Sequence, residues 1–159
     1  MSVALPFPAT PLGPIWLELV GMAPDSPVRA LHWGAPPEGA EVRGEHPYLQ
    51  ELRAYFAGQL KVFSVPVAPE GSVFQRRVWQ GLQGIPFGQT LSYGQLAARV
   101  GTHARPLGGA NGCNPIPIII PCHRVVGHNY KNGKGLGGFS APGGLATKRW
   151  LLAHEGVLP

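Results

Sequence analysis

Three residues able to do chemistry, Cys122, His123 and Arg124, stand side by side at the end of an apolar, proline-rich segment. Three prolines within residues 114–121 exclude a helix there and predict an extended stem. The thiolate is the reactive form of cysteine, and an adjacent imidazole and cation are expected to lower the pKa of the Cys122 thiol towards neutrality. A lone cysteine is more often a small buried hydrophobe, but this adjacency favours a nucleophile.

Glu155 is the only acidic residue in residues 71–159, which also hold nine Lys or Arg. It follows Leu151 and Leu152 by four and three positions, on the inward side of a predicted helix that Gly156 ends. A buried carboxylate is costly without a partner, so Glu155 is predicted to face one. The alternative is an exposed residue at the helix end.

The elements that must position these groups fall into two predicted domains. Residues 15–20 and 28–33 are predicted as a hairpin of short strands, and the apolar spacing in residues 47–60 predicts a helix. Turn-forming residues fill 63–71, and the charge balance changes there as well. We therefore expect a small α/β domain over residues 1–70 and a second domain over residues 71–159.

The second domain contains a candidate helix-turn-helix. Ser72 with Gln75 and Ser92 with Gln95 form two capping boxes that start helices, and Gly101 ends the second of them. A further short helix is expected to begin at Pro106 as its first residue. Residues 1–70 hold four Lys or Arg against seven Asp or Glu, so the positive charge lies in the second domain and favours a polyanionic partner.

At Pro121-Cys122-His123-Arg124-Val125, preceded by Asn114-Pro115-Ile116-Pro117, the chain resembles the O6-alkylguanine-DNA alkyltransferases, also called methylated-DNA–protein-cysteine methyltransferases. The resemblance continues in order over residues 71–156 and is carried by further motifs, namely Phe74-Gln75, Val78-Trp79, the run from Ile85 to Tyr93, Leu96-Ala97, Gly108-Gly109-Ala110 and the run from Leu151 to Gly156. It implies an α+β fold in which a small α/β domain with a short antiparallel sheet precedes a mainly helical, winged-helix-like domain.

The resemblance also implies a reaction, the irreversible transfer of an alkyl group from O6 of guanine in duplex DNA to Cys122. His123 is then the base that takes the thiol proton through a water, Glu155 orients His123, and Asn114 braces the hinge before the active site. Tyr93 helps to rotate the nucleotide and donates a hydrogen bond to the leaving guanine. Transfer needs no cofactor, and we expect a monomer acting once in the cytoplasm.

The remaining implied site residues fall into two sets. The DNA-binding set, which includes a finger residue that fills the vacated base stack, is Arg105, Tyr93, Gly108, Gly109, Ala110 and Arg124. The substrate pocket set is Val125, through its carbonyl, Ser140 and Pro121. Because a residue before proline avoids the helical region, Arg105 is expected just ahead of its helix.

Several alternatives remain open from the sequence. Cys113 is interpreted first as a buried hydrophobe, and otherwise as a second alkyl acceptor or an oxidation partner of Cys122. A zinc site built from Cys113, Cys122, His123 and His128 has no standard spacing, so no metal is expected. The chain could instead be a lesion-binding protein without catalysis, although such relatives replace the nucleophile, or a Cys-His hydrolase, which would not need a basic helix-turn-helix.

Overall fold

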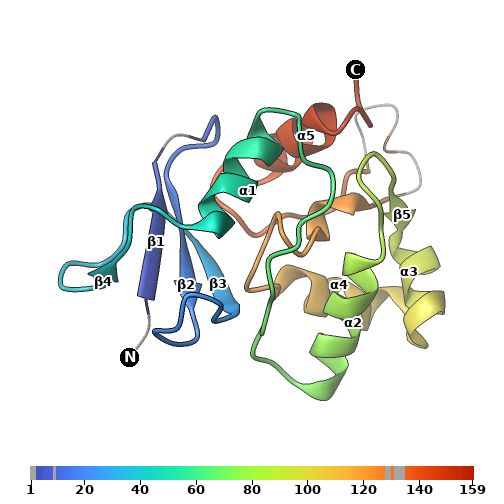
Figure 1. The fold of residues 1–159 in the computed structure, drawn as a ribbon. Helices are drawn as coiled ribbons and strands as arrows, with labels where there is room; N and C mark the ends of the chain where they lie inside the picture. Colours follow the sequence, from blue (N-terminus) through green and yellow to red (C-terminus); the bar gives the residue numbers. More distant parts are fainter. Residues whose placement is uncertain (1–2, 9, 128–129, 131–134) are drawn as a thin grey trace. The chain divides into compact units, whose positions relative to one another are not determined.

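The computed structural model describes residues 3–8, 10–127, 130 and 135–159. Contacts divide the chain into two compact units, Met1–Glu70 and Gly71–Pro159. Both units are drawn in Figure 1, with most of their helices and strands labelled. None of the helices in these described ranges is long and apolar enough to cross a membrane.

The first unit is a four-stranded sheet with one helix. The strands β1 (Val3–Phe7), β2 (Ile15–Leu19), β3 (Val28–Trp33) and β4 (Glu41–Val42) lie in the order β3-β2-β1-β4. β2–β3 is antiparallel, as the hairpin prediction requires, and β1–β2 is antiparallel as well, but β1–β4 is parallel, so the sheet is mixed. Leu5, Leu17 and Leu31 stand opposite one another across three strands and are buried.

The strand β1 was not predicted, because Pro6 and Pro8 interrupt its apolar pattern. β4 pairs only with Val3 and Ala4, so Pro6 stands beyond that short pairing and its missing N–H breaks no ladder hydrogen bond there. The helix α1 (Pro47–Phe56) packs against β1, with Phe56 stacked on Phe7. It ends before Gly58, which adopts φ +77°, and is therefore shorter than the predicted helix over residues 47–60.

The second unit is mainly helical. Its elements are α2 (Val73–Gln83), β5 (Leu91–Ser92), α3 (Tyr93–Val100), α4 (Ala104–Gly112), a 3-10 turn η1 (Cys122–Arg124), β6 (Val125–Val126) and α5 (Leu145–His154). Both predicted capping boxes are formed, at Ser72 and at Ser92. α2, α3 and α4 pack against one another, and β5 pairs with β6 in parallel. The predicted α+β class is confirmed.

The helix-turn-helix consists of α3 and α4. Gly101 caps α3 in the left-handed conformation, with φ +80°, where a side chain would be strained. The chain then enters α4 at Ala104, two residues earlier than expected, so Pro106 is the third helical residue. Proline is tolerated there because the first N–H groups of a helix have no partner within it.

Candidate active site

A tight turn delivers Cys122 to the site, where an extended stem was predicted. The Ile120 amide donates to the Ile116 carbonyl at 2.9 Å, and the Ile119 amide donates to the Pro117 carbonyl at 2.9 Å. Ile118, at the centre of this turn, has φ 74°, a conformation that a β-branched residue rarely adopts. The prolines do exclude a helix, but apolar burial folds this segment on itself instead of extending it.

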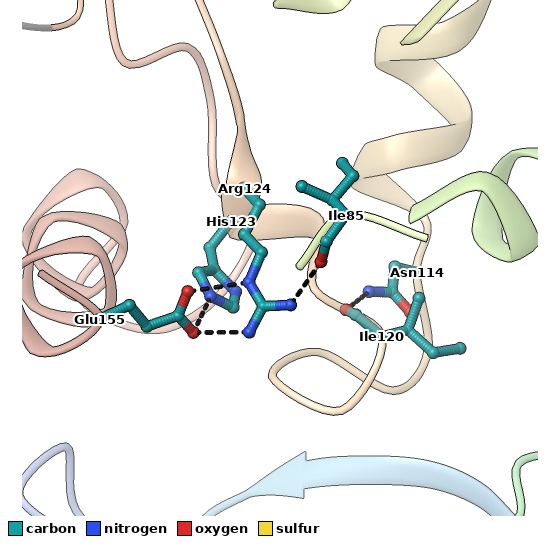
Figure 2. A network of polar contacts seen from close by, with 6 residues as sticks. All are labelled: Ile85, Asn114, Ile120, His123, Arg124 and Glu155. Atoms are coloured by element: carbon teal, nitrogen blue, oxygen red, sulfur yellow. Dashed lines mark hydrogen bonds and ion pairs between the residues drawn. The ribbon is translucent and has the colours of Figure 1, made fainter. Parts of the chain in front are cut away.

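Asn114 closes this turn with its side chain, as Figure 2 shows. Its Nδ2 donates to the Ile120 carbonyl at 2.7 Å, and its Oδ1 accepts from the Ile116 amide at 2.9 Å. The predicted bracing position of Asn114 therefore has a geometric basis, because one side chain fixes both ends of the turn that precedes Cys122. The role itself stays a prediction.

His123 and Arg124, which follow Cys122 in the sequence, form a buried network with Glu155 (Figure 2). His123 Nε2 lies 2.8 Å from Glu155 Oε2, and because a carboxylate only accepts, Nε2 carries the proton. Arg124 donates from Nε to Oε1 at 2.8 Å and from Nη2 to Oε2 at 3.0 Å. The hydrogen bonds from His123 and Arg124 hold the pKa of the Glu155 carboxyl well below its usual range, although burial acts to raise it.

Burial keeps His123 neutral, and the hydrogen bond to Glu155 orients its ring. Burial lowers the pKa of His123 below its ordinary value, and the Glu155 carboxylate opposes that shift. Since Nε2 holds the proton, Nδ1 presents a lone pair, and within the described part of the chain it has no hydrogen-bond partner. An imidazole in this state can accept a proton from a thiol through a bridging water.

The electrostatics of Cys122 differ from the expectation. The residue is 6% exposed, and burial raises the pKa of its thiol above the ordinary value. A hydrogen bond from Asn114 and the positive charge of Lys148 oppose the rise. The prediction of a lowered thiol pKa is wrong for the free protein, because desolvation outweighs the neighbouring charges.

Lys148 is the functional candidate that the sequence analysis missed. Its side chain is fully buried on α5, and Nζ donates to the Val125 carbonyl at 2.7 Å and to the Gly138 carbonyl at 3.2 Å. Burial lowers the pKa of Lys148 to about 8. The signal was available, because Lys148 precedes Leu151, Leu152 and Glu155 by three, four and seven positions, which places it on the same inward helix face.

The predicted pocket residues lie around these groups. Val125, whose carbonyl accepts from Lys148, is buried three residues after Cys122, and Pro121 is buried just before Cys122. The half-buried Tyr93 ring lies 5.7 Å from Lys148 Nζ, and burial raises the pKa of Tyr93. Ser140 is exposed and lies against α4, since a Cβ added at Gly112 would meet its Oγ at 3.4 Å.

The outer face of α4 carries part of the predicted DNA-binding set. Arg105 is exposed in the first turn of the helix, and not ahead of it as expected. A Cβ added at Gly108 or Gly109 would meet nothing within 4 Å, so both positions are open to a partner. Ala110 faces inward, with its carbonyl accepting the Trp79 indole N–H at 2.9 Å, and its role as a DNA contact stays a prediction.

Arg124 is wrongly predicted as a DNA contact. It is 6% exposed, its guanidinium holds Glu155, and Nη1 donates to the Ile85 carbonyl at 2.7 Å. A cation held in this way is not presented to DNA phosphates. The sequence shows only that Arg124 is a cation close to Cys122. In the structure its side chain points to the Glu155 carboxylate.

The location of Cys113 bears on its interpretation and on the proposed zinc site. Cys113 is exposed at the C-terminal end of α4, so its interpretation as a buried hydrophobe is wrong. Both cysteines are free thiols. In the ranges that the structure describes, no group of three or more His, Cys, Asp or Glu is placed to hold a metal, while His128 of the proposed zinc set lies outside those ranges.

Together, fold and site define a class of protein, a helix-turn-helix domain that carries a buried cysteine next to a histidine–carboxylate pair. Residues 73–157 match the family described as 6-O-methylguanine DNA methyltransferase, DNA binding domain. A methylated-DNA–protein-cysteine methyltransferase of Salmonella typhimurium is 41% identical over 94% of this chain and 94% of its own length. One from Methanosarcina acetivorans is 49% identical over 67% of this chain and 66% of its own length.

Solved structures agree with this assignment. The crystal structure of Mycobacterium tuberculosis O6-methylguanine methyltransferase matches with a TM-score of 0.81 and 35% identity, over 100% of this chain and 96% of that one. The same organism's OGT in complex with DNA matches with a TM-score of 0.79 and 36% identity, over 99% and 95%. The chain belongs to the methylated-DNA–protein-cysteine methyltransferase family, and the resemblance predicted from its motifs is confirmed.

Proposed function

We propose that this protein repairs DNA by moving the alkyl group of O6-alkylguanine onto Sγ of its own Cys122, once per molecule. The observation that carries the proposal is the Cys122-His123 pair backed by Glu155, with His123 Nε2 2.8 Å from the carboxylate and Nδ1 unpartnered among the described residues. Family membership supports the same reaction, since relatives are named methylated-DNA–protein-cysteine methyltransferases.

The first step is the removal of the thiol proton. The S–H bond of Cys122 breaks, and the proton passes through a water to His123 Nδ1. The Nε2–H group of His123 keeps its hydrogen bond to Glu155 Oε2. The product is a thiolate beside an imidazolium, whose charge the carboxylate stabilises. Because burial raises the thiol pKa, few thiolates exist before the base acts, which limits unspecific alkylation of the free protein.

The second step is an in-line displacement at the alkyl carbon. An S–C bond forms as the C–O6 bond breaks, and the electron pair of that bond leaves with the guanine. A hydrogen bond donated by the Tyr93 hydroxyl stabilises the negative charge that develops on the leaving guanine, and the guanine anion then takes its proton from water. Lys148 holds the Val125 carbonyl, a guanine contact on the family pattern, and its charge favours the thiolate. The thioether has no ready reverse reaction, and no cofactor is required.

Access to O6 requires the damaged nucleotide to leave the duplex. Extrusion of a base costs a few kcal/mol, which phosphate contacts and an inserted side chain offset. The open face at Gly108 and Gly109 suits close approach of a minor groove, and exposed Arg105 suits the vacated base stack. We assign DNA binding and transfer to residues 71–159.

The protein is proposed to act as a monomer in the cytoplasm, where two free thiols stay reduced. Intact-mass spectrometry after incubation with a duplex bearing O6-methylguanine tests the reaction. The expected result is a gain of one methyl group per molecule. An unchanged mass with tight lesion binding would instead indicate a lesion binder, and an unchanged mass with repeated ester hydrolysis would indicate a Cys-His hydrolase.

A further inference from the structure

Arg124 has three donors committed inside the protein. Nε and Nη2 reach the two oxygens of Glu155 at 2.8 and 3.0 Å, and Nη1 reaches the Ile85 carbonyl at 2.7 Å. The two-point contact with a carboxylate is the geometry that only a planar guanidinium provides. Arg124 is therefore fixed relative to Glu155 in both position and orientation.

The surroundings of Arg124 keep it in this place. Ile85 lies just after the C-terminal end of α2, where the helix dipole favours a positive charge. The Phe87 ring lies 5.9 Å from the guanidinium carbon, at cation–π distance. Since the side chain is almost fully buried, water competes little for these donors.

Arg124 shares an oxygen with the proposed base. Glu155 Oε2 accepts both from His123 Nε2 at 2.8 Å and from Arg124 Nη2 at 3.0 Å. An imidazolium at His123 would thus face a carboxylate whose charge is already balanced by a buried cation. Arg124 and Glu155 interact at short range in a buried site. Arg124 therefore weakens the stabilisation that Glu155 alone would give a protonated His123 ring.

We propose that Arg124 is a positioning residue that keeps His123 unprotonated at neutral and mildly acidic pH, through the carboxylate they share. This inference rests on the proposed function, in which His123 must be neutral to accept the Cys122 proton. It explains why a buried arginine stands beside the active cysteine without facing it. Burial already lowers the pKa of His123, and without Arg124 the Glu155 carboxylate would oppose that effect more strongly and favour the imidazolium.

Among the residues that the structure describes, three charged groups act on His123. Glu155 at the end of α5 favours protonation, while Arg124 on η1 and Lys148 on α5 disfavour it. Lys148 donates to backbone carbonyls and is unchanged by substitution at Arg124. The test therefore varies Arg124 alone.

Two matched variants separate charge from shape, because Arg124→Gln and Arg124→Lys both shorten the side chain and only the second keeps the charge. The measurement is an NMR pH titration of the His123 ring nitrogens in histidine-labelled protein without DNA, assigned with a His123→Gln variant. We expect Arg124→Gln to raise the midpoint by about one pH unit or more, while Arg124→Lys stays close to the parent protein. Arg53→Leu, in the other unit, is the control for loss of a positive charge.

The same variants give a kinetic readout. Since protonation of His123 removes the base, transfer by Arg124→Gln is expected to fall more between pH 8 and pH 6 than transfer by the parent or by Arg124→Lys, by up to about tenfold for each pH unit that the midpoint rises. Equal midpoints in all three proteins, or an equal shift in both variants, would overturn the proposal. If Arg124→Gln does not fold, the same comparison is made with Arg124→Met. Failure of the parent protein to accept any alkyl group would refute the proposed function instead. The NMR titration needs no alkyl transfer and still tests the role of Arg124.

Discussion

Replacing Glu155 by Gln keeps the size of the side chain and removes the one charge that balances Arg124 in the buried network. The carboxylate accepts from His123 and twice from Arg124, at 2.8, 2.8 and 3.0 Å. An amide offers one accepting oxygen and places an N–H₂ group against those same donors. The variant therefore leaves a buried guanidinium without its counter-charge.

The expected loss of stability is large. Removing one partner of a buried ion pair costs about 3–5 kcal/mol, because the remaining charge cannot be hydrated. This amount is a substantial part of the roughly 5–15 kcal/mol that stabilises a typical domain. The matched control is Glu38→Gln in the first unit, where the side chain is exposed and the change should stay within about 0.5 kcal/mol.

Urea unfolding, followed by tryptophan fluorescence and by circular dichroism, measures the loss as a function of pH. The folded-state pKa of Glu155 is depressed, so its contribution is complete above the unfolded value of about 4.3 and is lost as the pH falls. The difference between parent and variant should thus be constant from pH 6 to 8 and shrink below pH 4. A difference under about 1 kcal/mol at pH 7, or one that does not shrink in acid, would refute this reasoning.

Further predictions address other parts of the site. Lys148→Met removes the donor to the Val125 carbonyl and the cation that opposes the raised thiol pKa, so single-turnover transfer at pH 7.5 should slow more than tenfold while the protein stays folded. Arg105→Ala should slow transfer on duplex DNA but not on the free base, and equal slowing on both would exclude a finger role. Gly81→Val places carbon against Val100, because even a Cβ would lie 2.8 Å from its Cγ1, and should cost about 1–3 kcal/mol in urea unfolding. Binding of undamaged duplex should weaken linearly with salt on logarithmic axes, and salt-insensitive binding would contradict docking through phosphates.

Local rules in the sequence predicted much of the fold. The capping boxes at Ser72 and Ser92 and the glycine cap at Gly101 are signals within a few residues, and each is formed as expected. The strand β1 was missed because Pro6 is compatible with a strand only where the neighbouring strand is short, which no local pattern shows. The mixed sheet depends on the same long-range pairing.

Residue types in the site were easier to predict than their partners. Cys122, His123 and Glu155 could be found from motif and helix spacing, and the structure brings the last two together at 2.8 Å. Arg124 was misassigned because adjacency in sequence does not show which way a side chain points. The raised thiol pKa also escaped the sequence, since desolvation depends on packing from several elements.

The most direct test of the transfer reaction is the mapping of the alkylated residue under excess substrate. The parent protein is incubated with a tenfold excess of duplex containing O6-methylguanine, digested, and analysed by tandem mass spectrometry. The account predicts one methyl group per molecule, all of it on Cys122, with the remaining lesions left unrepaired. Methylation of Cys113 in place of Cys122, or repair of more than one lesion per protein molecule, would contradict it.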